Sequence, residues 1–335
     1  MDTFDDARRQ DRRGAAFIEN AAFESYNRAV STARISGHFL VTSLAILLAL
    51  LGAGACERKQ QTADPGAINA KDRADTANGP ADTTPLPGID ASKLDEAKQK
   101  QFYKLVGSLV SPCGKAHSLR KSVVEDTSCK RAPYAAKYVL ALVEDEAAEA
   151  KIREDYAAKY ETKDVPKLDV SKAPRLGNDD ANVVQIVEFY DYGCPHCREF
   201  KSILEQVLEA YRDKVSAYFL MFPLGNWPDS KSAAQAALAA NELGKFKEMH
   251  AALFEHAPQH SREAVMGYAK DLGLDMAKFT AAYEAAGPHV DADHAQGEKV
   301  EVHTTPTLFI NGRKFSGLSW KYLTMWIDEE AAVNR

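Results

Sequence analysis

Cys194 and Cys197, which enclose a proline and a histidine, are the residues of this sequence best suited to do chemistry. The run before them, VVQIVEFYDY, is largely apolar and of strand length. After them, apolar residues recur at helical spacing from Phe200 to Tyr211, which predicts a helix with one buried face. Pro195 suits the first position of that helix, where an N–H would be unpaired in any case. The pattern predicts a buried strand, a sharp turn and a helix that begins at the two cysteines.

This helix gives the two cysteines different environments. Counting back three residues from Phe200 puts Cys197 on the buried face, whereas Cys194 precedes the first turn and should be exposed. Unpaired N–H groups and the helix dipole stabilise a thiolate at that end, and His196 can add a donor or a positive charge. We therefore expect Cys194 to be the attacking and leaving sulfur, and Cys197 to resolve the mixed disulfide.

A C-x-x-C pair alone also fits half of a zinc site or a copper ligand pair. The sequence has no second C-x-x-C, which weighs against structural zinc. Two alternatives stay open: a metal-handling module that uses the two thiols with His303, and an interaction lipoprotein whose disulfide is only structural. We expect no metal and no cofactor beyond the redox-active cysteine pair, and structural roles for His250 and His303.

The order of strand, CPHC and amphipathic helix resembles the DsbA-like branch of the thioredoxin superfamily, over about residues 183–330. The run AYFLMFPL from Ala217 indicates a second strand, and KFKEMHAALFEH lies in helical patterns that resemble the insertion of that branch. VHTTPTLFINGRKFSG from Val302 looks like the second family signature, with a Thr-Pro step, a strand and an Asn-Gly hairpin turn. The expected fold class is α/β, a thioredoxin fold with a helical insertion, preceded by a small all-helical domain.

The resemblance implies a protein disulfide oxidoreductase that exchanges disulfides with cysteine-containing protein substrates and a membrane redox partner. It implies that Pro306 is cis and faces the cysteines, so that the backbone of Thr305 can pair with an extended substrate segment. Glu188 matches the buried acid thought to pass protons to the inner cysteine, although a strand-end Glu that reaches solvent is an equal alternative. Asp191 is expected to cap or turn the end of the strand.

The direction of the reaction depends on two residues. His196 between the cysteines resembles the oxidising branch, because it stabilises the thiolate and so the reduced enzyme. Thr305 before the proline is more typical of the isomerase and reductase branch. We expect an oxidase, with a disulfide reductase or isomerase as the alternative.

Residues 1–56 resemble an export signal. The apolar run 39–51 is too short for a confident membrane span, Arg34 precedes it, and small residues follow it. Cys56 then resembles the lipid-modified cysteine of bacterial lipoproteins, with an uncleaved anchor or simple cleavage as alternatives. We expect lipidation at Cys56 and a location on the periplasmic side of a bacterial membrane.

The rest of the chain is expected to form three regions. Residues 57–89 are polar and predict a disordered tether, whereas 90–165 show helical spacing and predict a small helical domain. Cys113 and Cys129 in that domain are expected to form a structural disulfide. Residues 161–181 are expected to connect to the thioredoxin-like domain at 180–335, with its helical insertion at about 228–298. The net charge of −6 argues mildly against nucleic acid as a partner.

Overall fold

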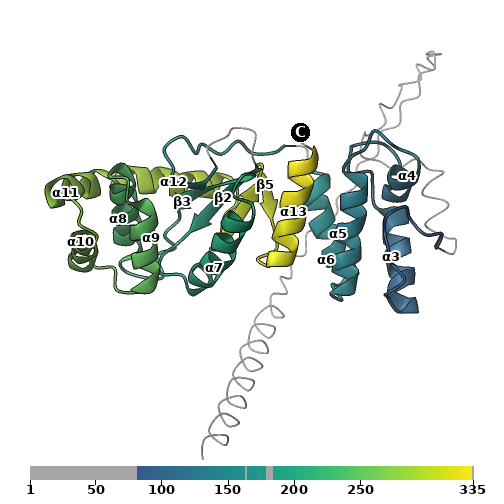
Figure 1. Cartoon of the computed structure of the whole chain (residues 1–335), viewed down its shortest axis with the longest axis horizontal. Helices are drawn as coiled ribbons and strands as arrows, with labels where there is room; N and C mark the ends of the chain where they lie inside the picture. The colour runs from purple at the N-terminus through teal and green to yellow at the C-terminus, as the bar shows by residue number, and fades with distance from the viewer. Residues whose placement is uncertain (1–80, 163, 179–183, 334–335) are drawn as a thin grey trace, which may run out of the picture. The chain divides into compact units, whose positions relative to one another are not determined.

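The computed structural model of the protein describes residues 81–162, 164–178 and 184–333 (Figure 1). Four helices come first in the described chain: α3 (Glu96–Ser108), α4 (Leu119–Val124), α5 (Ala132–Glu144) and α6 (Glu149–Tyr160). Asp95 and Ser118 cap the first two, since each side chain accepts a hydrogen bond from a backbone N–H of the first turn. Fully buried Phe102, Val139 and Ile152, from three of these helices, form part of one apolar core.

Cys113 and Cys129 are joined by a disulfide, with their Cα atoms 5.8 Å apart. Cys113 precedes α4 and Cys129 follows it, so the bond closes a loop around this short helix. The packed region begins earlier than residue 90, because Leu86 and Ile89 are both buried in the core. The expected boundary of the tether at residue 89 was therefore too late. Large apolar residues are few in this segment, but Leu86 and Ile89 pack into the core.

The second part is built on a five-stranded sheet with the order β1-β3-β2-β4-β5. Its strands are β1 (Arg175–Gly177), β2 (Val184–Tyr190), β3 (Val215–Met221), β4 (Thr307–Ile310) and β5 (Arg313–Phe315). Only β2 and β3 are parallel to each other. Six of the seven residues of β2 are buried, as expected for an apolar central strand. The edge strand β1 was not expected, because its three residues carry no apolar pattern and lie in what the sequence indicated to be a connection.

Alternate residues of β2 face two separate cores. Ile186 and Tyr190 belong to the larger core, together with Phe200 of α7 (Pro195–Ala210) and Leu323 of α13 (Trp320–Val333). Phe189 packs on the other face of the sheet with Phe222 and Phe309. By the same alternation, Glu188 lies on the face that α7 covers.

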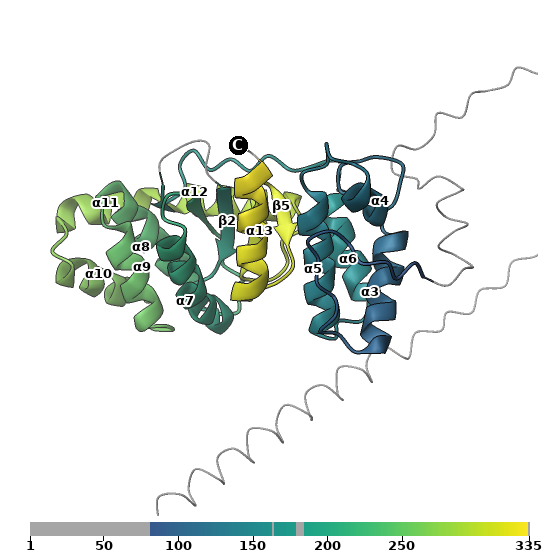
Figure 2. The same ribbon diagram turned by 45° about the vertical axis from the view of Figure 1, so that its right-hand side comes forward.

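The insertion consists of α8 (Ser230–Glu242), α9 (Phe246–Glu255), α10 (Arg262–Asp271), α11 (Met276–Ala285) and α12 (Gly287–Lys299). These helices run from Ser230 to Lys299, and the expected insertion was at about 228–298. Figure 2 shows α8 and α9 beside α7. A Cβ atom on Gly297 would lie 2.6 Å from the Phe222 ring, so glycine is needed where α12 crosses this part of the core.

Buried charges join the two parts within the described region. Arg131 before α5 contacts Glu329 and Glu330 of α13 at 2.9 and 2.6 Å. Lys159 of α6 lies 3.0 Å from Glu329 and above the ring of Trp326, 3.6 Å from its centroid. Burial lowers the pKa of Lys159 to about 8. Removing one partner of such a group would leave an uncompensated buried charge.

Candidate active site

Asp191 organises the loop between β2 and α7. Its carboxylate accepts hydrogen bonds from the N–H of Gly193 at 2.8 Å, the hydroxyl of Ser230 at 2.6 Å and the N–H of Leu224 at 2.9 Å. Asp191 turns the end of the strand, and it also ties this loop to the loop after β3 and to the first residue of α8. These contacts fix the chain at the point where α7 begins.

Cys194 is the N-cap residue of α7 and Pro195 is its first helical residue. Both Cys194 and Cys197 are free thiols. The expected exposure of Cys194 was wrong, because only 4% of the residue is accessible. The reason lies in distant segments that cover it: its sulfur is 3.3 Å from the carbonyl oxygen of Thr305, and Trp227 lies against the adjacent Gly193.

The pKa of the Cys194 thiol is lowered to about 5. The largest cause is a hydrogen bond from the Cys197 thiol, and the Thr305 hydroxyl and the N–H groups of Cys197 and His196 add to it against the opposing effect of burial. The Thr305 hydroxyl is buried and has no hydrogen-bond partner among the described residues, so its proton is free to turn toward the sulfur. Cys194 is therefore mostly a thiolate at neutral pH.

Cys197 is fully buried, on the helix face that the sequence predicted. Burial, its hydrogen bond to Cys194 and the charge of Glu188 all raise the pKa of its thiol. Glu188 is only 3% exposed, so the buried alternative holds for this residue. Burial, and the charge of Cys194, raise the pKa of Glu188 to about 8.

Glu188 and Cys197 line one small cavity of about 10 Å³ beneath the redox pair. This volume is close to the smallest that holds a single water. A single water in this cavity would link the two groups for proton transfer.

The remaining site residues are placed as follows. Pro306 is cis and buried, next to Thr305, and both precede β4. His196 is exposed and its ring lies 3.6 Å from Glu199, so its backbone N–H and not its ring contributes to the lowered pKa of Cys194.

Neither of the other two histidines singled out in the sequence contacts the sulfur atoms. His250 is buried and its Nδ1 lies 3.0 Å from the hydroxyl of Tyr192, and burial lowers its pKa to about 3. His303 is exposed. Among the described residues, no group of three or more His, Cys, Asp or Glu side chains is placed to hold a metal ion.

Three residues near Cys194 were missed in the sequence. Arg198, Trp227 and the cis Pro258 line a cavity of about 200 Å³ together with Cys194. Arg198 could have been found, since it lies one helical turn after Cys194. Trp227 and Pro258 come from loops before and within the insertion, and no local pattern links those loops to the cysteines.

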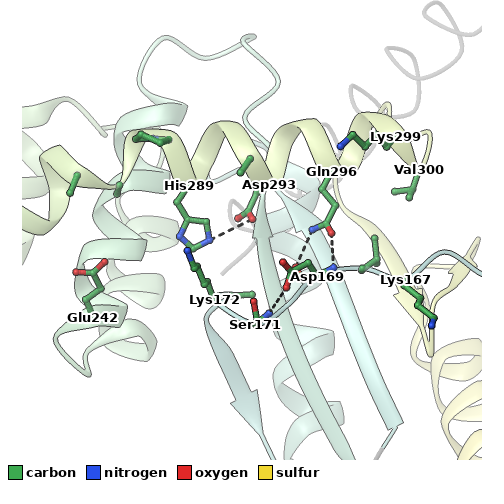
Figure 3. Close-up of a pocket in the computed structure, with 16 residues that line it drawn as sticks. Lys167, Asp169, Ser171, Lys172, Glu242, His289, Asp293, Gln296, Lys299 and Val300 are labelled. Carbon is green, nitrogen blue, oxygen red and sulfur yellow. Dashed lines mark hydrogen bonds and ion pairs between the residues drawn. The ribbon is translucent and has the colours of Figure 1, made fainter.

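A larger cavity of about 760 Å³ lies away from the cysteines, between the segment 167–173 and α12 (Figure 3). Gln296 binds the backbone of Asp169 there at 2.6 and 3.1 Å, and His289 lies 3.6 Å from Asp293. Asp293 in turn accepts a hydrogen bond from the N–H of Met221 at the end of β3. These polar contacts attach α12 to the sheet and to the segment before β1.

Cys56 and the apolar run 39–51 lie outside the described residues. Within the described part of the chain, no helix is long and apolar enough to span a membrane.

Residues 169–329 match the family model described as thioredoxin. This part of the chain resembles a thioredoxin-family domain, and the thioredoxin fold expected from the sequence is confirmed. The match begins before β1, which places the start of the domain ahead of the expected residue 180.

The chain also resembles curated proteins over part of their length. It is 33% identical over 146 residues to the Na(+)/H(+) antiporter NhaA 1 of Mycobacterium sp. (strain KMS), covering 42% of this chain. It is 33% identical over 138 residues to NhaA 3 of Salinispora tropica. The chain spans about a quarter of the length of the curated relatives it matches, 24% and 21% in these two cases.

Solved structures similar to this chain include one that is named for thiol-disulfide exchange. BdbD from Bacillus subtilis (oxidised) is 24% identical, with a TM-score of 0.45, over 49% of this chain and 95% of that one. The thiol-disulfide exchange protein alpha-DsbA2 from Wolbachia pipientis is 27% identical, with a TM-score of 0.42, over 47% of this chain and 86% of that one.

Proposed function

We propose that this chain is a protein disulfide oxidoreductase that passes the disulfide of Cys194 and Cys197 to cysteine-containing protein substrates. The observation that carries the proposal is the contrast between the two thiols. Cys194 has a pKa of about 5 and borders an open cavity, whereas Cys197 is buried beneath it with a raised pKa. A stable outer thiolate and a protonated inner thiol are what a disulfide-exchange pair requires.

The first step begins with the oxidised pair. A substrate thiolate attacks the sulfur of Cys194, the bond between Cys194 and Cys197 breaks, and Cys197 leaves as a thiolate. Most of the Glu188 carboxyl is protonated at neutral pH because its pKa is about 8, so it can give its proton to Cys197. The product is a mixed disulfide between the substrate and Cys194.

The second step releases the substrate. A second substrate thiolate attacks the substrate sulfur of the mixed disulfide, and Cys194 leaves with the electron pair as a thiolate. The substrate has then lost two electrons and gained a disulfide, and the protein pair has been reduced. The carbonyl of Thr305, 3.3 Å from the Cys194 sulfur, lies where an extended substrate segment can pair with the backbone during both steps.

The oxidase direction follows from the stability of the thiolate. Each group that hydrogen-bonds the Cys194 sulfur stabilises the reduced pair and so makes the disulfide a stronger oxidant. In this structure the Thr305 hydroxyl acts in the same direction as the helix N–H groups. We place the reaction on the periplasmic side of a bacterial membrane, with lipid attachment at Cys56 and a membrane redox partner that restores the disulfide.

The experiment that tests this proposal follows the refolding of a reduced, unfolded disulfide protein with the oxidised chain as the only oxidant. We expect activity of the substrate to return, and Cys194→Ser to abolish that return. If the oxidised chain transfers no disulfide while its reduced form efficiently rearranges scrambled disulfides, the direction is that of an isomerase or reductase. If neither form exchanges disulfides, the proposed function is wrong.

A further inference from the structure

The cavity of about 200 Å³ beside Cys194 has one apolar wall and one charged group. Trp227 and Pro258 supply apolar surface, and Gly193 and Pro195 complete the side next to the sulfur. Trp227 is pressed against the loop, since a Cβ atom on Gly193 would lie 2.7 Å from its Cγ. The wall is therefore held in place beside the reacting sulfur.

Apart from the Cys194 thiolate of the reduced protein, Arg198 is the only charged residue among those that line this cavity. It lies four residues after Cys194 on α7, so the two side chains are on one face of the helix. A long helical side chain leans back toward the N-terminus of its helix, which agrees with Arg198 lining the cavity.

Arg198 differs from the other basic side chains of α7 and from Arg212, which follows the helix. His196 pairs with Glu199, Lys201 pairs with Glu205, and Arg212 pairs with Glu209. Arg198 has no ion pair among the described residues, and the acidic residue closest to Trp227 in the sequence, Asp229, does not line the cavity. The cavity thus offers an uncompensated cation beside an indole.

Arg198 is also not among the groups that are the largest causes of the lowered pKa of Cys194. Those groups are Cys197, Thr305 and the N–H groups at the start of α7. The main stabilisation of the thiolate therefore comes from these groups, and the charge of Arg198 is available to a bound molecule.

We infer that this cavity is a specificity subsite that binds the carboxylate of an aspartate or glutamate adjacent to the reacting cysteine of the substrate. The inference rests on the proposed function and adds the substrate class. The aliphatic stem of the acidic residue packs on Trp227 while its carboxylate meets the guanidinium, for which Arg geometry is suited. The contact forms in the mixed disulfide and changes no covalent step.

The test compares peptides that hold two cysteines and close an internal disulfide. In one peptide a glutamate precedes the first cysteine, and in its partner a glutamine takes that place. For each peptide, kcat/KM for oxidation by the oxidised full chain is measured first. This value is then divided by the rate constant for the reaction of the same peptide with a small reference disulfide. The division is needed because a neighbouring charge changes the intrinsic reactivity of the peptide thiol. We expect a Glu to Gln ratio of about five, equivalent to about 1 kcal/mol at ~1.4 kcal/mol per tenfold.

Arg198→Met should reduce this ratio to about one, and Arg198→Glu should invert it. The matched control is Arg212→Met, which removes the same charge at the far end of α7 and should leave the ratio unchanged. Higher ionic strength should reduce the preference, as expected for an accessible ion pair.

Two further measurements make the outcome decisive. The pH titration of the Cys194 thiolate should have the same midpoint in Arg198→Met as in the unsubstituted protein. An unchanged midpoint shows that Arg198 acts on substrate binding and not on the pKa of the Cys194 thiol. Equal corrected rates for the two peptides, or a preference that survives Arg198→Glu, would overturn the subsite while leaving the proposed function intact. Failure to oxidise any peptide would reject the proposed function itself.

Discussion

Glu188 and Cys197 line the same small cavity beneath the redox pair, and replacing Glu188 by glutamine tests whether this carboxyl moves the Cys197 proton. When the reduced protein reacts with a disulfide, Cys197 must lose its proton before it can resolve the mixed disulfide on Cys194. The pKa of the Cys197 thiol is raised, so hydroxide in bulk water is an inefficient base for it. The carboxylate of Glu188 is the nearby alternative.

The magnitude follows from the pKa of Glu188, which is about 8. Roughly a tenth of this group is ionised at pH 7 and about half at pH 8, so the resolving step should be about fivefold faster at pH 8. Below pH 7 it should fall about tenfold per pH unit. Glutamine cannot accept a proton, and we expect Glu188→Gln to slow this step at least about 10-fold and to flatten its dependence on pH in this range.

The assay mixes reduced protein with a symmetrical aromatic disulfide whose thiolate absorbs visible light. Attack by Cys194 releases the first thiolate and attack by Cys197 releases the second, so the two phases report the two steps. Glu205→Gln is the matched control, since Glu205 lines the same cavity but is paired with Lys201 at the surface. A second phase that is independent of pH in the unsubstituted protein, or equally fast in Glu188→Gln, would refute the role of Glu188.

Three further predictions concern other parts of the chain. Gly193→Ala should destabilise the protein by about 1–3 kcal/mol in chemical denaturation, because its Cβ would displace Trp227. Loss of the disulfide in Cys113→Ser/Cys129→Ser, whose cysteines are 16 residues apart, should cost about 3 kcal/mol, and a midpoint equal to that of the unsubstituted protein would contradict this. Cys56→Ser should release the protein from membranes in fractionation, and retention of the variant there would favour an uncleaved anchor.

The sequence predicted what local patterns determine. The apolar run of β2 and the start of α7 at Pro195 follow from periodicity and from the position of proline. The buried position of Cys197 follows from the same helical spacing.

What the sequence could not predict depends on contacts between distant segments. Cys194 is covered by Thr305 and by the loop that carries Trp227, which are 111 and 33 residues away, so counting along one helix could not reveal its burial. The strand β1 forms only because β3 offers an edge to pair with. The charges of Arg131 and Lys159 are compensated by α13 at the opposite end of the described chain, which no local pattern indicates.

The central claim is that Cys194 is a stable thiolate above a protonated Cys197. It is tested most directly by the rate of alkylation of the reduced protein as a function of pH, with the labelled cysteine identified by mass spectrometry. We predict labelling at Cys194 with a midpoint at about pH 5, set by the pKa of that thiol. Labelling of Cys197 first, or a midpoint at ~8.5 as for an ordinary cysteine, would contradict the account.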